Sequence, residues 1–370
     1  MPVVDLALPF RAPLDLGGLF AFLRARAVPG VEDAGARHYR RSLRLPRGPA
    51  VVELRPGDGD MAARLSVSDT RDVADAEARV RALLGLDADP EPVAAALGDD
   101  PHLGPLLREN PGIRVPGAVD GAEIVARAVL GQQVSVAAAR TTTGRLAAAL
   151  GEPISGDAAS GRAPVSSRGA PISNDSATGG NAASHGARAS NGDTASNGEA
   201  SDGAPATNGD PASNRDSASN RNGTSDGNAA SSRGSPSTGH EPITRLFPTA
   251  AALAEGAAHV LTGSRRRTET LRTACAAIAD GTLAVHADRK PDRLREELQR
   301  IPGVGPWTAN YVVLRVLGDP DVLLDGDLAL RRGAARLGLP ERPDRLREHA
   351  ERWRPWRSYA GLLLWRANQR

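Results

Sequence analysis

Cysteine and lysine are almost absent from the chain: among 370 residues each occurs once, as Cys275 and Lys290. A single thiol excludes a disulfide framework and a cluster held by four cysteines. No grouping of histidine with cysteine predicts a zinc or other transition-metal site. The sequence also lacks a signal peptide and any apolar run long enough to cross a membrane. These absences predict a cytoplasmic protein without membrane contact.

The excess of positive over negative charge is small, at +2, but it is unevenly distributed. Residues 1–150 carry 18 basic and 19 acidic side chains, and residues 151–243 carry 6 and 10. Residues 244–370 carry 22 basic and 15 acidic side chains. A positive excess in one segment is typical of a protein that binds a polyanion, although many solvated helical surfaces carry a similar charge.

Residues 151–243 contain no leucine, phenylalanine, tyrosine or tryptophan, and consist mostly of small and polar residues. Such a segment has too little apolar surface to offset the entropy that it would lose on ordering. We therefore expect a disordered insertion. Because helical patterns flank it on both sides, we expect it to interrupt one domain and not to separate two.

The remaining sequence predicts an α+β fold that is mainly helical and carries an N-terminal antiparallel sheet. In residues 1–95, short apolar runs between Pro- and Gly-rich turns predict a sheet with helices packed on one face. The predicted strands are Val3–Leu8, Tyr39–Leu45, Ala50–Leu54 and Ala63–Val67, and the predicted helices are Leu14–Ala27 and Asp72–Leu84.

Residues 96–150 and 244–370 together predict a helical core. Asp120 and Glu123 form a capping-box pattern before one helix. The segment 131–135 interrupts that helix, and the serine at its end can cap the next one. After the insertion, amphipathic patterns predict helices over Pro248–Ala257, Arg267–Asp280, Asp292–Ile301, Pro306–Leu317, Asp327–Leu337, Pro343–Trp353 and Ser358–Ala367.

Two of these helices are joined by the turn Pro302–Gly305, and the second helix begins at Pro306. Proline is tolerated at a first helical position because its missing N–H would have no partner within the helix. The two glycines let the backbone pass close to another surface, and the amides at the helix start can bind an anion. This helix–turn–helix unit predicts a clamp for one phosphate of a nucleic-acid backbone.

Asp327 follows the hairpin in the sequence Leu324-Asp325-Gly326-Asp327, at the expected N-cap of a helix. Free N–H groups and the helix dipole favour the ionised carboxylate at such a position. Next to a sugar ring, this carboxylate can stabilise the positive charge that develops as a base leaves, or orient the attacking water. Two alternatives are an ordinary N-cap at Asp327 and a site shared with Asp325.

Three motifs resemble a known family: Gly305–Tyr311, Gly326–Leu328 and Glu351–Ala360. They are similar to DNA-3-methyladenine glycosylase II, the alkylbase branch of the helix-hairpin-helix DNA glycosylase superfamily. The resemblance covers nearly all of the chain except its middle. It implies a monomeric enzyme of base excision repair, without a required cofactor, that flips an alkylated base out of double-stranded DNA and hydrolyses its N-glycosidic bond.

The resemblance also implies roles for particular residues. Asp327 would be catalytic. Four aromatic residues would line the base pocket, where electron-rich rings suit a cationic alkylated base: Trp307, Tyr311, Trp365 and Phe22. Core packing is the alternative for each of the four, and the other two tryptophans are expected to pack in the core.

Contacts with DNA are implied for four further residues. Gly303, Gly305 and Thr308 would donate to a DNA phosphate. Gln133 occupies the position whose side chain fills the gap left by the extruded base. The family pattern has leucine there, so glutamine is a departure, although it could also hydrogen-bond the orphaned partner base. A plain helix–helix turn is the alternative for this segment.

A monovalent cation at the hairpin is a further implication of the resemblance. Its ligands would be the backbone carbonyls of Gln299, Ile301 and Val304. Backbone ligands leave no side-chain pattern, so the sequence neither supports nor excludes this site.

Trp307 bears on the type of reaction. Superfamily members that also nick the backbone have a nucleophilic lysine at this hairpin position, which forms a Schiff base with the sugar. Here the only lysine is Lys290, in a turn before the hairpin. The prediction is a monofunctional glycosylase in which water is the nucleophile. The alternatives are a non-catalytic helix-hairpin-helix DNA-binding module and a glycosylase/lyase for oxidised bases.

Overall fold

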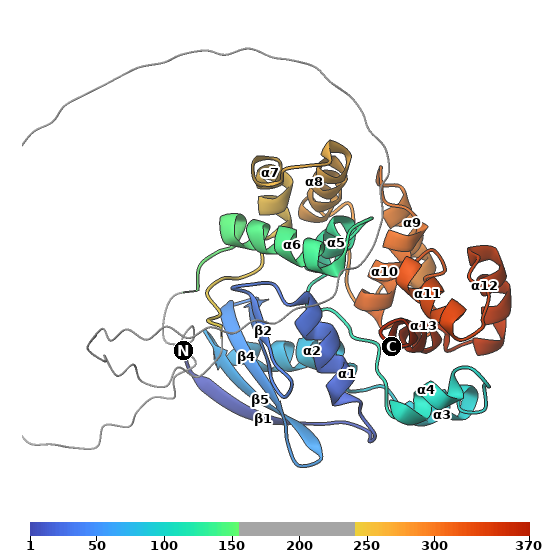
Figure 1. The fold of residues 1–370 in the computed structure, drawn as a ribbon. Coiled ribbons are helices and arrows are strands. Elements are labelled where there is room, and N and C mark those ends of the chain that lie inside the picture. Colours follow the sequence, from blue (N-terminus) through green and yellow to red (C-terminus); the bar gives the residue numbers. More distant parts are fainter. Residues whose placement is uncertain (155–240) are drawn as a thin grey trace, which may run out of the picture. The chain divides into compact units, whose positions relative to one another are not determined.

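The computed structural model describes residues 1–154 and 241–370, which belong to one compact unit. It confirms the predicted fold class, because a five-stranded antiparallel sheet is joined to a larger set of helices (Figure 1). Most of the predicted insertion, residues 155–240, lies outside the described residues. The domain boundaries at 95 and 243 stay predictions, and helix α3 (Pro90–Leu97) spans the first of them.

The sheet has the strand order β1-β5-β4-β3-β2, with every neighbouring pair antiparallel. Its strands are β1 (Val3–Pro9), β2 (Glu32–Ala34), β3 (Tyr39–Leu45), β4 (Gly48–Pro56) and β5 (Asp60–Val67). In β5 alternate side chains are buried, which is the two-residue period of a strand with one face on a core. The four predicted strands are confirmed; β2 was not predicted, because it is short and polar.

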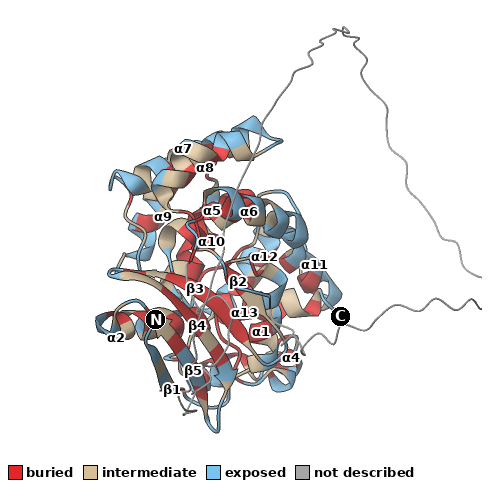
Figure 2. Ribbon diagram, turned by 90° about the vertical axis from the view of Figure 1, so that its left-hand side faces the viewer, coloured by how far each residue is buried: buried red, intermediate tan, exposed pale blue. Residues whose placement is uncertain are grey.

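Two helices cover the sheet with their apolar sides, α1 (Leu16–Arg26) and α2 (Val73–Leu84). Leu19, Phe20 and Leu23 of α1 belong to the same buried cluster as the inward-facing residues of β3, β4 and β5. Figure 2 shows these buried residues running along the strands. The cluster fixes α1 against the sheet, and the end of α1 is thereby held near the helical part of the molecule.

The helical part contains the hairpin and the elements around it. Its helices are α4 (Gly104–Glu109), α5 (Gly121–Leu130), α6 (Val136–Leu150), α7 (Ala250–Val260), α8 (Arg265–Ala279), α9 (Pro291–Gln299), α10 (Pro306–Leu317), α11 (Leu328–Arg336), α12 (Pro343–His349) and α13 (Arg357–Ala367). The helices predicted after residue 120 are confirmed to within a few residues at their ends. Two short helices before that point, α3 and α4, were not predicted as separate elements.

A buried group of charges connects the sheet to α5. Glu32 in β2 and Glu123 in α5 are each only 5 % exposed, and Arg41 in β3 is 3 % exposed. Arg41 donates to Glu123 at 2.8 Å, and Arg127 forms ion pairs with both Glu32 and Glu123. Asp120 caps α5 as predicted, but Glu123 binds these arginines. This network explains why the glutamate of a short polar strand, Glu32, is buried.

The chain segments on either side of residues 155–240 lie side by side. The N–H of Ile154 donates to the carbonyl of Thr244 at 2.9 Å, and the N–H of Leu246 donates to that of Glu152 at 2.9 Å. Ile154 and Ile243 are buried with Leu246 in a small apolar cluster. Composition placed residues 151–154 and 241–243 in the insertion, whereas the structure describes them as part of the folded unit.

Candidate active site

The hairpin has the predicted form. Gly305 is the N-cap of α10, and Pro306 is its first residue. Gly303 has a φ of +89°, and a Cβ at this position would lie 2.0 Å from the hydroxyl oxygen of Thr270 on α8. Only glycine fits there without displacing the Thr270 side chain. The turn is therefore pressed against α8 on one side and open at Gly305 on the other, where an added Cβ would meet nothing within 4 Å.

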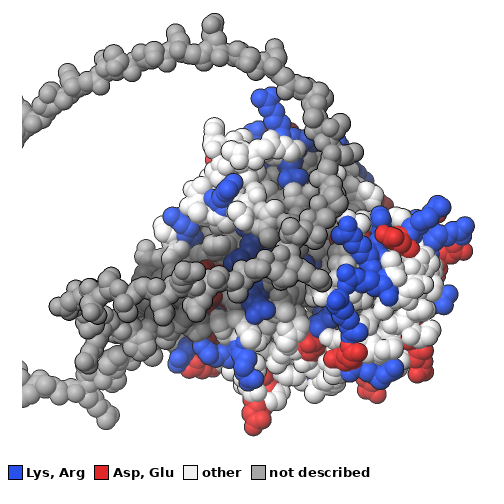
Figure 3. All heavy atoms as spheres, in the orientation of Figure 1, with Lys and Arg blue, Asp and Glu red and all other residues white. Residues whose placement is uncertain are grey.

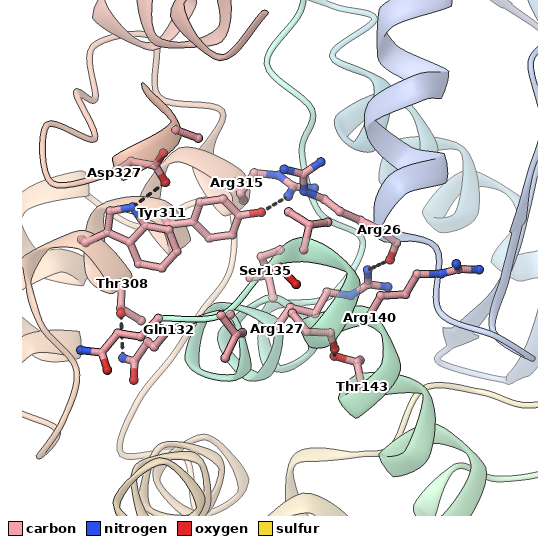
Figure 4. Close-up of a pocket in the computed structure, with 18 of the residues that line it drawn as sticks. Arg26, Arg127, Gln132, Ser135, Arg140, Thr143, Thr308, Tyr311, Arg315 and Asp327 are labelled. Carbon is pink, nitrogen blue, oxygen red and sulfur yellow. Dashed lines mark hydrogen bonds between the residues drawn. The ribbon is translucent and has the colours of Figure 1, made fainter. Parts of the chain in front are cut away.

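Asp327 is the N-cap of α11, as predicted. Its Oδ1 accepts the N–H of Leu330 at 2.9 Å and the indole N–H of Trp365 at 3.0 Å. Its Oδ2 accepts the indole N–H of Trp307 at 3.1 Å (Figure 4). The side chain is half-buried and lines a cavity of about 1200 Å³. Three donors from three helices thus hold the carboxylate in one orientation at the cavity wall.

Asp325 lies outside this arrangement. Its carboxylate accepts the Nε–H of Arg347 at 2.7 Å, and it is not among the residues that line the cavity. The two aspartates are two residues apart, but one carboxylate forms an ion pair with a side chain of α12 and the other binds two indoles. The geometry therefore favours Asp327 over Asp325 as the carboxylate of the site.

The four aromatic residues predicted for the base pocket are brought together. Trp307 and Tyr311 are stacked, with ring centroids 5.4 Å apart and an interplanar angle of 10°. Phe22 and Trp365 are also stacked, at 6.5 Å and 27°. All four line the same cavity as Asp327. The two remaining tryptophans lie elsewhere, and Trp353 is 1 % exposed in the core, as expected.

Arg26 and Arg315 lie next to the aromatic residues of this cavity and were not predicted as site residues. The guanidinium of Arg26 lies over the Phe22 ring at 3.7 Å, so a base cannot stack on that face of the ring. Arg315 donates to the Tyr311 hydroxyl at 2.7 Å and also lies over Phe22, at 5.0 Å (Figure 4). Burial alone would raise the pKa of Tyr311, but the charges of Arg315 and Arg26 outweigh burial and lower it.

The positions of these arginines in the sequence gave no signal. Arg26 is one of two basic residues in the last turn of α1, where cations are common. Arg315 lies within α10 and is buried because it donates to the carbonyls of Pro116 and Gly117, about 200 residues earlier in the chain. The cavity wall therefore contains the guanidinium groups of Arg26 and Arg315 as well as the carboxylate of Asp327.

Gln133 lines the cavity and is exposed, in the segment between α5 and α6. Among the described residues it is the only one other than glycine with a positive φ, at +57°. Its exposure and position are compatible with insertion into DNA, and that role stays a prediction.

The predicted phosphate donors differ in accessibility. Gly303 and Gly305 are half-buried in the turn. Thr308 is 3 % exposed, and its hydroxyl oxygen accepts a hydrogen bond from the Gln132 side chain at 2.9 Å. Its hydroxyl is therefore buried against Gln132, and its backbone N–H, in the first turn of α10, has no partner within the helix and can bind a phosphate.

Exposed arginines lie near the hairpin. Figure 3 shows basic side chains gathered over the part of the surface where α9, α10 and α11 lie in Figure 1. Arg266 and Arg332 line the cavity, are exposed, and form no ion pair with a carboxylate of the described residues. Neither arginine was predicted as a site residue, because in the sequence each is only one of 22 basic residues in the segment 244–370.

The cation site at the hairpin stays a prediction. The Ile301 carbonyl accepts the N–H of Val304 at 3.0 Å, which uses one of its two lone pairs and leaves the other available. No group of histidine, cysteine, aspartate or glutamate within residues 1–154 and 241–370 could hold a metal ion. In the same ranges, no helix has the length and apolar character needed to cross a membrane.

Comparison with known sequences relates this chain to proteins of DNA repair. Residues 5–120 match the family described as the AlkA N-terminal domain. A Mycobacterium tuberculosis protein named "Probable bifunctional transcriptional activator/DNA repair enzyme AlkA" is 36 % identical over 362 residues, which is 98 % of this chain and 56 % of that protein. The chain thus spans about half the length of this relative. Escherichia coli DNA-3-methyladenine glycosylase 2 is 28 % identical over 363 residues, 97 % of this chain and 95 % of that protein.

Comparison with solved structures gives the same fold. The 3-methyladenine DNA glycosylase of Archaeoglobus fulgidus superposes with a TM-score of 0.66 at 17 % identity, covering 99 % of this chain and 98 % of that one. Together with the hairpin and the aspartate that follows it, these matches establish the relationship. Residues 5–120 therefore belong to the AlkA N-terminal domain family, and the chain is similar over nearly its whole length to proteins named AlkA and DNA-3-methyladenine glycosylase 2.

Proposed function

We propose that the protein is a DNA glycosylase that hydrolyses the N-glycosidic bond of alkylated bases in double-stranded DNA. The observation that supports this best is the Asp327 carboxylate, held by the indole groups of Trp307 and Trp365 at the wall of an aromatic cavity. A base rotated out of the duplex would enter this cavity and bring its sugar next to Asp327.

The proposed chemistry follows from the charge of the carboxylate. As the base leaves, positive charge develops on the sugar, and an ionised Asp327 opposite it stabilises that charge and orients the attacking water. A base alkylated at a ring nitrogen is cationic and leaves readily, so little acid catalysis is needed. The stacked pair Trp307 and Tyr311 offers such a base an electron-rich surface.

We propose further that the enzyme has no lyase activity. A lyase needs an amine close to the sugar, and Trp307 occupies the hairpin position beside Asp327. Lys290, the only lysine in the sequence, is exposed at the N-cap of α9 and does not line the cavity. Water is then the nucleophile. We propose that this reaction requires no cofactor. The monomeric state and the cytoplasmic location stay predictions.

The second candidate is a non-catalytic helix-hairpin-helix DNA-binding module. Such a module needs the hairpin, but it does not need a carboxylate held by two indoles. It also does not need four aromatic side chains around one cavity. These additional features favour the enzyme.

Base release from duplexes that each contain one defined lesion tests the proposal. We expect release of 3-methyladenine or 7-methylguanine, strand breakage only after alkali, and no adduct trapped by borohydride. Lys290→Ala should behave as the wild type does. Strand breakage without alkali or a trapped wild-type adduct would establish a lyase. Binding to DNA without release from any lesion would favour the binding module.

A further inference from the structure

Three segments that are distant in the sequence meet behind the hairpin turn. They are the segment 131–135 between α5 and α6, the first turns of α8, and the turn Pro302–Gly305 with the start of α10. All three contribute to the wall of the cavity. Hydrogen bonds between them determine how the segment that carries Gln133 is placed relative to the hairpin.

Gln132 makes the direct connection. Its side-chain nitrogen donates to the carbonyl of Gly303 at 3.0 Å and to the hydroxyl oxygen of Thr308 at 2.9 Å. A glutamine amide has two N–H donors, and the hairpin accepts both. Figure 4 shows Gln132 and Thr308 pointing toward one another from their separate elements. Since Thr308 is buried, this contact is shielded from water and holds its geometry.

Helix α8 supports both partners of this contact. Arg267 donates from Nη2 to the backbone carbonyl of Gln132 at 2.8 Å. The hydroxyl of Thr270 lies 3.0 Å from the carbonyl of Pro302 and 3.0 Å from that of Arg266 in its own helix, and its one proton is shared between these two acceptors. The backbone of the 131–135 segment and the backbone of the turn are thus fixed to the same helix, in addition to their connection through the Gln132 side chain.

The residue next to Gln132 has an unfavourable backbone conformation. Gln133 has a φ of +57°, which places it in the left-handed region that residues with a Cβ rarely adopt. Such a conformation persists only where the surrounding contacts impose it. Gln133 is exposed, so the contacts that impose its backbone conformation come from its neighbours in the chain. Among these neighbours, Gln132 forms hydrogen bonds with the hairpin and with α8.

We infer that Gln132 is a positioning residue that fixes the left-handed backbone of Gln133 and sets its distance from the phosphate-binding amides of the hairpin. When the hairpin holds a phosphate, the Gln133 side chain then faces the base stack at a defined point. Gln132 itself needs no contact with DNA for this role. The inference rests on the proposed function, because it assumes that the protein extrudes a base.

The test separates base extrusion from DNA binding. Duplexes with one lesion and a neighbouring 2-aminopurine report unstacking by stopped-flow fluorescence, and duplex affinity and base release are measured on the same preparations. Gln132→Ala should slow extrusion and base release about tenfold, in line with the loss of two hydrogen bonds, and change duplex affinity less than threefold. Wild-type extrusion in Gln132→Ala, or an equal loss of affinity and extrusion, would overturn the inference.

Thr308 supplies a second pair of variants that does not alter the 131–135 segment. Thr308→Val removes the hydroxyl at nearly constant volume and should slow extrusion about three- to fivefold, whereas Thr308→Ser, which keeps the hydroxyl, should slow extrusion less than Thr308→Val does. Thr141→Val, on the exposed side of α6, is the matched control. Equal extrusion by the Val and Ser variants would also overturn the inference, even if Gln132→Ala did not fold.

The double variant adds a measure of coupling. Thr308→Val should cost less extrusion in the Gln132→Ala background than in the wild type, because the shared hydrogen bond is already lost. Additive losses would contradict the inference. Failure of the wild type to release any base would instead refute the proposed function, so the two failures are distinguishable.

Discussion

The indole N–H of Trp365 donates to the carboxylate of Asp327 at 3.0 Å, across 38 residues of sequence. Trp307 holds the other carboxylate oxygen, so neither oxygen can turn away from the cavity without losing a hydrogen bond. The aromatic residues thus have two functions here. They supply stacking surfaces, and they orient the charged group of the site.

Asp327→Asn should abolish most base release. Asparagine has the same volume and can still cap α11, but it lacks the negative charge opposite the developing sugar cation. We expect release to fall roughly hundredfold to thousandfold, corresponding to about 3–4 kcal/mol. The amide nitrogen would also meet the N–H of Trp307, so the free energy of unfolding should fall by about 1–2 kcal/mol. Single-turnover release and urea unfolding measure the two effects.

Asp325→Asn is the control for this substitution. It removes a partly exposed ion pair with Arg347, which is worth about 1 kcal/mol or less, and leaves the cavity unchanged. Base release should stay within about twofold of wild type. A large loss in this variant with normal release in Asp327→Asn would transfer the catalytic role to Asp325.

Trp365→Phe should slow release of every lesion by a similar factor. Phenylalanine keeps a ring against Phe22 but removes one of the donors that orient Asp327. A loss of about tenfold corresponds to one charge-assisted hydrogen bond. Release of hypoxanthine and 7-methylguanine would be compared, with Trp356→Phe as the control. A loss confined to one base would show that Trp365 acts by contacting the base and not through Asp327.

Stability should fall in acid because of Glu32. Burial alone would raise the pKa of this carboxyl, but the charges of Arg127 and Arg41 lower it from 4.5 to about 2. A lowered pKa means that the stabilisation is complete above about pH 4.5 and is lost as the pH falls toward 2. The loss should be on the order of 3 kcal/mol.

Urea unfolding between pH 7 and pH 2 tests this assignment. Glu32→Gln should be less stable at pH 7 by roughly 3–5 kcal/mol, since it leaves two buried arginines, Arg41 and Arg127, with one carboxylate partner, Glu123, in place of two, and its stability should depend less on pH. Glu296→Gln, at an exposed position, should retain the wild-type profile. Equal pH dependence in wild type and Glu32→Gln would show that other carboxyl groups are responsible.

Affinity for duplex DNA should depend moderately on salt. The hairpin and a few arginines can make about three to five phosphate contacts, which gives a slope of log affinity against log salt of about −3 to −4. Arg266→Ala and Arg332→Ala should each reduce the slope by about 1 and weaken binding to damaged and undamaged duplexes alike. Arg342→Ala, whose guanidinium pairs with Asp344, serves as the control. A wild-type slope near zero would contradict DNA binding.

Replacement of residues 155–240 by a short Gly-Ser linker should preserve base release. The flanking segments are already hydrogen-bonded to each other, so the linker has only a short distance to span. A shorter closed loop loses less entropy on folding, and the free energy of unfolding should rise by roughly 2 kcal/mol. A folded, shortened protein that has lost activity on naked duplex DNA would show that the replaced residues take part in the reaction.

The hairpin and the N-cap at Asp327 were predictable because their signals are local. Proline at a first helical position, glycine in a tight turn and aspartate before a helix each act within a few residues of sequence. Arg315 and Gln132 were not predictable, because their roles depend on partners far along the chain. Within its own helix Arg315 resembles any residue of an amphipathic pattern, and only the fold brings the Pro116 carbonyl to it.

The hydrogen bonds that join Ile154 to Thr244 and Leu246 to Glu152 bear on how such a gene can change. Once the ends of a connection are joined in this way, the entropic cost of closing the loop between them grows only with the logarithm of the number of residues in it. Codons can then accumulate at this point, or be lost from it, without disturbing the register of the flanking helices. The same position should accept a whole foreign domain, such as a fluorescent reporter, whose termini lie close together.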